Sequence, residues 1–304
     1  MYAVEARGLV KRFVSYARLG FFKRRRIIVN ALRGVSLNVK WGEVYGLLGP
    51  NGAGKTTTVK ILSTLLIPDE GEAYVDGHNV VDEANRVKPI IGLLLYPDRG
   101  FYSRLSGLEN LTYFGRLYGL SSVEAYRRAI ELLKLVDLEW AKDRPYEEYS
   151  LGMKARLALA RALINDPLVV FLDEPTIGLD PISSRIVRGI VRDLAKQGKA
   201  IIMTSHNLWE VERVCDRVGF IKDGRIVLEG SPSEVKARLG LRYVVEVEYE
   251  HMGNVELGRF EVDDPVQGVK RILSEMESSN IRVTSIRIHE PSLEDAYVKV
   301  IKGG

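Results

Sequence analysis

Three glycines, a lysine and a threonine fall within eight residues, and their spacing suits the binding of a phosphate group. Glycines leave backbone N–H groups open to close approach by phosphate oxygens, and a helix that begins after them directs its positive end at the same oxygens. Lys55 adds a cation for the terminal phosphates, and Thr56 offers a hydroxyl to Mg²⁺. The loop therefore predicts a nucleoside triphosphate site. Its residues are Gly49, Pro50, Asn51, Gly52, Ala53, Gly54, Lys55 and Thr56, followed by Thr57.

Two adjacent carboxylates form the second candidate group. Asp173 and Glu174 end the apolar run 168–174, which is typical of a strand buried in a parallel sheet, and ligands bind at the carboxyl edge of such sheets. Asp173 is suited to hold Mg²⁺, directly or through water, and Glu174 to orient or deprotonate an attacking water. Alone, such a strand more often ends in an ordinary turn. The phosphate loop favours the catalytic interpretation.

A histidine and a capped helix complete the candidate site. His206 ends a further apolar strand, 200–206, where its imidazole can reach a γ-phosphate, although a histidine after a strand is more often a loop residue. Ser150 is a good N-cap for a helix whose apolar face carries Leu157, Ala160 and Leu163, and the positive end of that helix can attract an anion. From the pattern alone, this helix is equally an ordinary capped helix.

The elements that must position these groups predict an α/β fold. The order is a strand over 43–48, the loop, and then a helix over 57–62. Residues 96–159 are predicted to be mostly helical, with a capping box that begins at Ser121. Beyond residue 239 the pattern changes to a half-buried strand over 243–250, a helix near 266–276 and a strand over 281–288, which predict a small α+β accessory domain.

Composition narrows the class of protein. With 304 residues, 46% hydrophobic and 28% charged, the chain predicts a globular protein with one large and one smaller domain. It has no apolar run long enough to span a bilayer and no signal-peptide pattern, so we expect a cytoplasmic location. The net charge of +4 is too small to indicate nucleic acid. The single Cys215 excludes an internal disulfide and is predicted to be a core residue on a helix.

The order of these motifs resembles that of ABC transporter ATP-binding subunits over residues 1–238, and the fold implied is a P-loop NTPase core with a helical subdomain at about 96–159. In that family, residues 49–56 are the Walker A motif, 150–153 the signature, 171–174 Walker B and 178–181 the D-loop. The resemblance implies ATP and Mg²⁺ as ligands. It also implies that Lys55, Glu174 and His206 are catalytic, that Ser150 and Gly152 contact ATP held by another subunit, and that Asp180 communicates across that interface.

The implied functional unit is a dimer with a separate transmembrane permease, on the inner face of the cell membrane. The resemblance to drug and bacitracin exporters favours export. A soluble ABC ATPase of translation or DNA repair is the alternative, but translation members usually carry two cassettes and repair members a long coiled coil. This chain has one cassette, and only 95 residues separate Lys55 from Ser150. A nucleotide-binding regulator without turnover is disfavoured by the full set of catalytic residues, and residues 239–304 carry no catalytic group.

The sequence departs from the family pattern at three points. Leu151 replaces the first glycine of the signature. The Q-loop glutamine is absent, and Asp98 or a water would have to replace it near Mg²⁺. The aromatic residue expected to stack on adenine is Phe13, with Tyr16 as the alternative, but Phe13 lies 36 residues before Gly49 because of an insertion at 15–27. The insertion mixes basic and apolar residues, so it is either a solvated loop or a contact for anionic lipid or an acidic permease segment.

Overall fold

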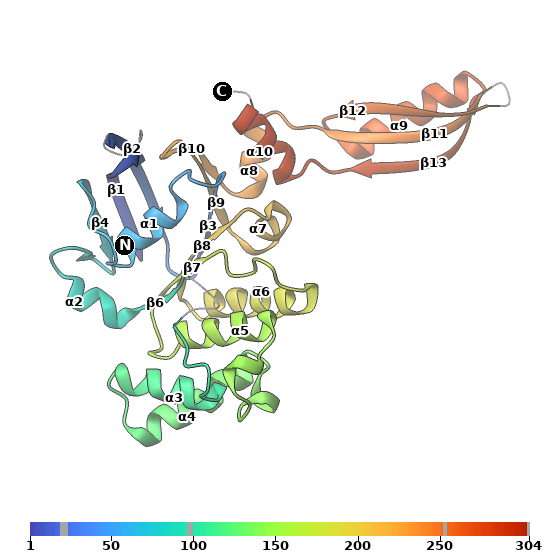
Figure 1. Cartoon of the computed structure of the whole chain (residues 1–304). Helices are drawn as coiled ribbons and strands as arrows, with labels where there is room; N and C mark the ends of the chain where they lie inside the picture. The colour runs from blue at the N-terminus through green and yellow to red at the C-terminus, as the bar shows by residue number, and fades with distance from the viewer. Residues whose placement is uncertain (19–23, 96–99, 252–253, 303–304) are drawn as a thin grey trace. The chain divides into compact units, whose positions relative to one another are not determined.

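The computed structural model describes residues 1–18, 24–95, 100–251 and 254–302. The chain forms two compact units, Met1–Ser231 and Pro232–Gly304 (Figure 1). The sequence pattern predicted a domain boundary after residue 238, on the other side of a short helix, and the assignment of functional domains to these units remains a prediction. In the described part of the chain, no helix has both the length and the apolar character that crossing a membrane requires.

A six-stranded sheet organises the first unit, in the order β10-β9-β3-β8-β7-β6. Its strands are β3 (Val44–Leu48), β6 (Ile91–Leu94), β7 (Val169–Asp173), β8 (Ala200–Ser205), β9 (Arg217–Lys222) and β10 (Arg225–Gly230). All neighbours pair in parallel except β10, which is antiparallel to β9. Every residue of β3, β7 and β8 is buried, as their apolar sequences predict. Their carboxyl ends share one edge, so the loops that follow them meet there.

A second, antiparallel sheet has the order β2-β1-β4-β5. Its strands are β1 (Val4–Arg18), β2 (Arg24–Val39), β4 (Glu70–Val75) and β5 (His78–Asn79). Helix α1 (Lys55–Leu62) packs with both sheets, because buried residues such as Leu9, Val59 and Phe171 belong to one core cluster. The first residues of α1 are therefore fixed by the packing of its apolar face.

Most of the α-helices that follow α1 in the first unit begin at a capping side chain. The helices after α1 are α2 (Ala84–Val87), α3 (Gly107–Leu117), α4 (Ser122–Leu135), α5 (Leu151–Ala162), α6 (Pro181–Lys196) and α7 (Leu208–Val214), with 3₁₀ turns η1 (Lys88–Ile90), η2 (Glu139–Ala141) and η3 (Tyr146–Glu148). Both α3 and α4 begin with a capping box, at Ser106 and Ser121, which confirms the prediction for Ser121. Helices α3, α4 and α5 account for most of the predicted helical region.

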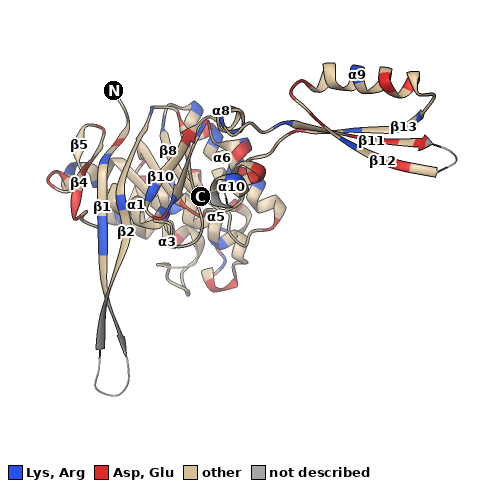
Figure 2. Ribbon diagram, turned by 90° about the horizontal axis from the view of Figure 1, so that it is seen from above, with Lys and Arg blue, Asp and Glu red and all other residues tan. Residues whose placement is uncertain are grey.

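The second unit is a three-stranded antiparallel sheet, in the order β12-β11-β13, with helices. Its elements are α8 (Pro232–Arg238), β11 (Tyr243–His251), β12 (Asn254–Val262), α9 (Pro265–Ser278), β13 (Arg282–His289) and α10 (Leu293–Lys302). Val245, Val247, Val262 and Ile272 form its buried core. The predicted strand over 243–250, the helix and the last strand are confirmed, whereas β12 was not predicted. In Figure 2, α9 carries both basic and acidic residues.

Candidate nucleotide site

The loop between β3 and α1 has the geometry that a phosphate requires. Gly52 and Gly54 lie at positive φ, 80° and 113°, where residues with side chains are strained. A Cβ on Gly49 would come within 2.2 Å of the Ile221 carbonyl oxygen, so this position accepts glycine alone. No side chain caps the N-terminus of α1, so its first N–H groups remain available to an anion.

Lys55 is the buried cation of this loop. Its side chain is 7% exposed, and Nζ donates hydrogen bonds to the carbonyl oxygens of Gly49 at 2.6 Å and Pro50 at 3.3 Å. The same nitrogen lies 3.8 Å from Glu174 Oε1. The ammonium is therefore held between the loop and the carboxylate, at the place where the sequence predicts terminal phosphates.

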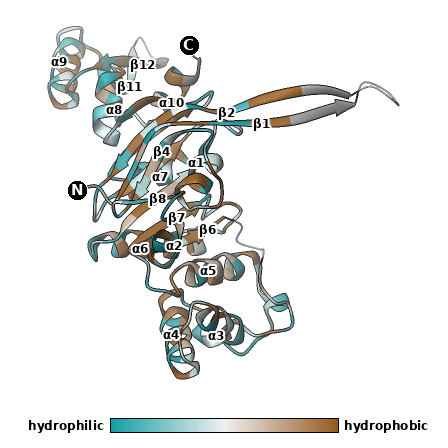
Figure 3. Ribbon diagram, turned by 90° about the vertical axis from the view of Figure 1, so that its left-hand side faces the viewer, coloured by the Kyte–Doolittle hydropathy of each residue, from teal (hydrophilic) through white to brown (hydrophobic). Residues whose placement is uncertain are grey.

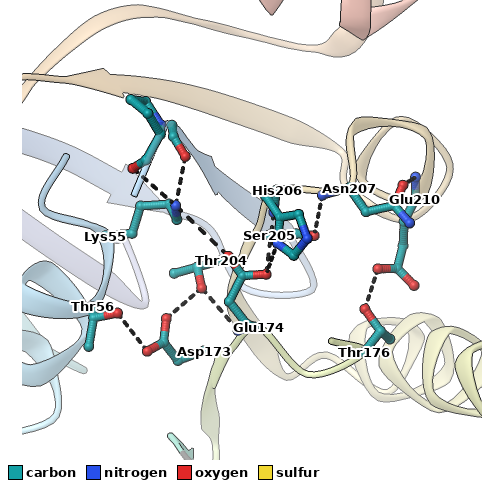
Figure 4. Close-up of polar contacts among 12 residues, drawn as sticks. Lys55, Thr56, Asp173, Glu174, Thr176, Thr204, Ser205, His206, Asn207 and Glu210 are labelled. Atoms are coloured by element: carbon teal, nitrogen blue, oxygen red, sulfur yellow. Dashed lines mark hydrogen bonds and ion pairs between the residues drawn. The ribbon is translucent and has the colours of Figure 1, made fainter. Parts of the chain in front are cut away.

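Thr56 and Asp173 come together as predicted for a magnesium site. Thr56 Oγ1 donates to Asp173 Oδ2 at 2.7 Å, and Asp173 Oδ1 accepts from Thr204 Oγ1 at 2.5 Å (Figure 4). A hydroxyl and a carboxylate are hard oxygen donors of the kind Mg²⁺ prefers, and Mg²⁺ on a nucleotide uses few protein ligands. The described residues contain no cluster of three or more His, Cys, Asp or Glu side chains that could hold a metal ion.

Glu174 and His206 form the second half of the site. Glu174 Oε2 lies 2.8 Å from His206 Nδ1 and also accepts from the His206 backbone N–H at 3.3 Å (Figure 4). An ionised carboxylate only accepts, so Nδ1 carries the hydrogen and Nε2 of the neutral ring is free to accept. His206 is 58% exposed along its side chain and Glu174 is 20% exposed. Solvent and substrate can therefore reach both groups.

Thr204 was not predicted as a site residue, yet its hydroxyl contacts both Walker B residues, the Asp173 carboxylate and the Glu174 backbone. Its Oγ1 donates to Asp173 and accepts from the Glu174 backbone N–H at 3.0 Å. The Glu174 backbone has a φ of 51°, in the left-handed region that non-glycine residues rarely adopt. The Thr204 contacts hold this turn in place. The signal in the sequence was a hydroxyl two residues before His206 on a strand that is otherwise almost wholly apolar.

The signature and the D-loop meet within one chain. Ser150 caps α5, since its Oγ accepts from the Met153 backbone N–H at 3.2 Å, and the residue is exposed. Asp180 caps α6 by accepting from the N–H groups of Ile182 and Ser183, both at 2.9 Å. These hydrogen bonds lower the pKa of the Asp180 carboxyl. Gly152 is buried between the two caps. Ser150 and Asp180 thus lie on the surface of the first unit.

The structure describes the remaining predicted residues only in part. Phe13 lies on β1 opposite Val29, with 41% of its side chain exposed and Lys11 Nζ 5.9 Å from the ring centre. Its role toward adenine stays a prediction, because no described contact joins it to the phosphate loop. The side chain of Tyr16 and the whole of Asp98 lie outside the described residues.

The interpretation of residues 15–27 as a loop is wrong for its two arms. Residues 15–18 continue β1 and residues 24–27 belong to β2, and the two arms pair in antiparallel register from Ser15 opposite Ile27 to Arg18 opposite Arg24. The run of basic residues at 23–26 favours a loop, whereas the β-branched residues Ile27, Ile28 and Val29 that follow it favour a strand. Side chains 15–26 lie outside the described residues.

The arrangement at this sheet edge is that of a P-loop nucleoside triphosphatase. It combines a phosphate loop, a paired hydroxyl and carboxylate, and the Glu174–His206 pair. Residues 32–177 match the family model described as ABC transporter. The daunorubicin/doxorubicin resistance ATP-binding protein DrrA of Streptomyces peucetius is 37% identical over 97% of this chain and 91% of its own length. The chain belongs to the ABC transporter ATP-binding proteins, and it is an ATPase.

Other relatives agree with this assignment and with the predicted export-type class. The linearmycin resistance ATP-binding protein LnrL of Bacillus subtilis (strain 168) is 33% identical over 88% of this chain and 93% of its own length. A dimeric structure of the ATP-binding cassette MJ0796, bound to ADP and Pi, matches with a TM-score of 0.65 and 28% identity, over 75% of this chain and 98% of that one. The P-loop ABC ATPase fold predicted from the sequence is confirmed.

Proposed function

We propose that this chain hydrolyses MgATP at the interface between two ATP-binding subunits and thereby drives export by a separate transmembrane permease. One observation carries the proposal: the loop of Lys55, the Thr56–Asp173 pair and the Glu174–His206 pair lie at one edge of a single sheet. The export direction is supported by the similarity to DrrA and LnrL, both of which are resistance ATP-binding proteins.

In this proposal, each residue of the site has one chemical role. Lys55 and the N–H groups of the loop neutralise the β- and γ-phosphates, and Thr56 and Asp173 hold Mg²⁺, which offsets the charge that develops on the leaving phosphate oxygens. Glu174 accepts a proton from water as the water oxygen attacks the γ-phosphorus and the bond to the β–γ bridging oxygen breaks. His206 keeps Glu174 in place through Nδ1–H. Its neutral ring can accept a hydrogen bond from the water at Nε2, and its protonated ring can donate from Nε2 to the γ-phosphate.

A second subunit completes the site in this proposal. Ser150 and Gly152 lie at the start of α5, and Asp180 lies at the start of α6, where surface groups can contact ATP held by a partner. The dimeric form of the MJ0796 cassette supports such an arrangement. The partner is a second copy of this chain or a closely similar subunit.

We further propose that the paired arms of β1 and β2 contact the membrane or the permease, which would place the subunit on the inner face of the membrane. Val14, Ile28 and Val29 are about half exposed, and Val14 pairs with Ile28 across the two strands. Strands with both apolar and basic residues suit an interface with anionic lipid. The apolar stretch of both strands is visible in Figure 3.

A test of the catalytic assignment compares Glu174→Gln with Lys55→Ala. Glu174→Gln preserves shape but removes the base, so steady-state hydrolysis should fall by roughly two to four orders of magnitude, with ATP affinity retained and an ATP-bound dimer trapped on a sizing column. Lys55→Ala should instead weaken binding of the nucleotide. Near-normal turnover by Glu174→Gln would remove Glu174 from the role of base.

A further inference from the structure

Glu210 is a fully buried carboxylate that the proposed chemistry does not use. It lies in the first turn of α7 with an exposed fraction of 0%. Arg188 of α6 donates from Nη1 to Oε1 at 2.9 Å, and Thr176 donates from Oγ1 to Oε2 in a short hydrogen bond (Figure 4). Burying a carboxylate is costly unless it is paired and hydrogen-bonded, and here each oxygen has its own donor.

Thr176 connects this carboxylate to the turn that carries the base. It lies two residues after Glu174, and the turn is closed by hydrogen bonds from the Ile177 N–H to the Glu174 carbonyl at 3.2 Å and from the Leu179 N–H to the Thr176 carbonyl at 3.1 Å. Thr176 is joined to Glu174 by the covalent backbone and by the turn that the Ile177 N–H closes on the Glu174 carbonyl. Movement of Thr176 would therefore displace Glu174. The side chain of Glu174 depends on a backbone that is already in an uncommon conformation.

On the other side, Glu210 connects to the loop that carries the histidine. Asn207 follows His206 directly and caps α7, since its Oδ1 accepts from the Glu210 N–H at 3.2 Å. The Asn207 N–H in turn donates to Ser205 Oγ at 3.0 Å. Contacts thus run from Glu174 to His206, along the chain to Glu210, across to Thr176 and back to Glu174.

We infer that Glu210, together with Thr176 and Arg188, is a positioning group that fixes the turn of Glu174 relative to the loop of His206. The inference rests on the proposed roles of Glu174 and His206. The direct contact between those two side chains is open to solvent on the His206 side and is weak by itself, whereas the buried ion pair resists displacement. A misplacement of about 1 Å at a reacting group can cost on the order of 100-fold in rate.

The test uses Thr176→Val in the full chain, with Thr176→Ser as the conservative variant. Valine keeps the volume and leaves the Glu210–Arg188 pair intact, but it removes the hydroxyl donor. The kcat for ATP hydrolysis should fall about tenfold with the KM for ATP within about twofold, because the lost contact acts on geometry and not on ATP binding. Thr176→Ser should recover at least about half of the wild-type kcat, since it restores the donor.

Arg192→Gln is the matched control, because Arg192 also joins α6 to the far end of α7. It donates to the Val214 carbonyl at 3.0 Å and to Asp216 Oδ1 at 2.8 Å, one turn beyond Arg188 on the same helix. This variant should lower the Tm with kcat preserved. The inference is overturned if Thr176→Val keeps its kcat, if Thr176→Ser does not recover it, or if Arg192→Gln loses as much.

The same assay separates this inference from the proposed function. Glu174→Gln is measured beside Thr176→Val. If Glu174→Gln remains active, the assignment of the base is wrong, and Glu210 then has no catalytic base to position. If Glu174→Gln is inactive while Thr176→Val is normal, the base assignment stands and the inference alone fails. Loss in both, with recovery by serine, supports both.

Discussion

At the scale of single residues, burial decides which side chains can react. Cys215 ends α7, where its N–H donates to the Val211 carbonyl at 2.9 Å, and its side chain is buried. Burial raises the pKa of the Cys215 thiol, because the thiolate is not solvated in the interior. Cys215, predicted to lie on a helix, is thus the C-cap of α7, and it is a structural cysteine.

We predict that Cys215 in the native protein reacts slowly with a thiol reagent such as DTNB, even at alkaline pH. The unfolded chain should react at once, which provides the control. Because the folded pKa is raised, the stabilisation is complete below the unfolded value of about 8.5 and decreases as the pH rises above it. Fast stoichiometric labelling of native protein would contradict the burial of the thiol.

The residues of the catalytic loops could be predicted because their chemistry is local in the sequence. Lys55, Thr56, Asp173 and Glu174 follow strands whose apolar character is unmistakable. Thr204 and Glu210 could not be predicted in this way, because their roles depend on partners some 30 residues away that only the folded chain brings close. Spacing along the chain does not encode which of several hydroxyls and carboxylates is buried.

At the scale of elements, the two capping boxes give a pH-dependent prediction. Glu109 accepts from the Ser106 N–H at 2.7 Å, and this backbone hydrogen bond, with a further contribution from the Ser106 side chain, lowers the pKa of the Glu109 carboxyl. A lowered folded pKa stabilises α3 above the unfolded pKa, and the stabilisation is lost as the pH falls through the folded value. Glu109→Gln should therefore melt below wild type at pH 7.

The difference in Tm between wild type and Glu109→Gln should shrink as the pH is lowered, because a protonated Glu109 resembles glutamine. Circular dichroism melts over a pH series provide the measurement. Glu124→Gln in the capping box of α4 should show the same dependence on pH, since the Ser121 N–H donates to Glu124 at 2.9 Å and the Ser121 hydrogen bonds lower the pKa of the Glu124 carboxyl. A difference in Tm that is independent of pH would show that the charge of Glu109 does not act on the helix.

The β1–β2 arms give the second prediction at this scale. Replacing four of the five basic residues of the insertion with serine should weaken binding to anionic liposomes, because each contributes about 1 kcal/mol near such a surface. Added salt should weaken wild-type binding likewise. ATPase activity should hold, since none of the four belongs to the nucleotide site. The residues are Lys23, Arg24, Arg25 and Arg26.

A control with the same loss of charge separates local contact from net charge. Four exposed basic residues elsewhere in the first unit are suited to this purpose: Arg86, Arg127, Lys134 and Lys196. Replacing them with serine should leave liposome binding nearly unchanged. If both sets weaken binding equally, the arms have no special role. If activity collapses in the insertion variant, those residues belong to the nucleotide site.

Strands with a continuous apolar run or a regular alternation could be predicted, whereas a strand with neither pattern could not. Strand β11 was predicted because its valines alternate with glutamates. Strand β12 was missed because Val255 and Leu257 are exposed on one face while Phe260 and Val262 face the other, so no alternation is visible. In the arms of β1 and β2 a run of basic residues favours a loop, and only the structure shows that the two arms pair as strands.

At the scale of the whole molecule, a composite site predicts complementation between inactive variants. Ser150→Arg should block hydrolysis and spare ATP binding, because Ser150 acts on the nucleotide of the partner subunit. Lys55→Ala should instead weaken the binding of ATP to its own subunit. Mixing the two proteins should restore part of the activity through one intact site in each mixed dimer. Each variant mixed with itself is the control, and a mixture as inactive as its components would argue against a shared site.

The enzyme should also lose specific activity on dilution, as pairs of subunits separate. A rate that stays proportional to enzyme concentration at high dilution would indicate that one chain is sufficient. The assay uses the same ATP turnover measurement over a dilution series, and the two units, Met1–Ser231 and Pro232–Gly304, are kept together in the full chain.

The burial of Gly152 has a consequence for how members of this family are recognised. A Cβ at Gly152 would come within 2.6 Å of Ser183 Oγ and 3.0 Å of Asp180 Oδ2, whereas Leu151 beside it is 49% exposed. The two glycines usual in the signature are thus under unequal constraint. In this chain the first position holds an exposed leucine, whereas a side chain at the second would meet the cap of α6. A motif search that demands both glycines would discard functional sequences such as this one, and a search weighted toward the second would retain them.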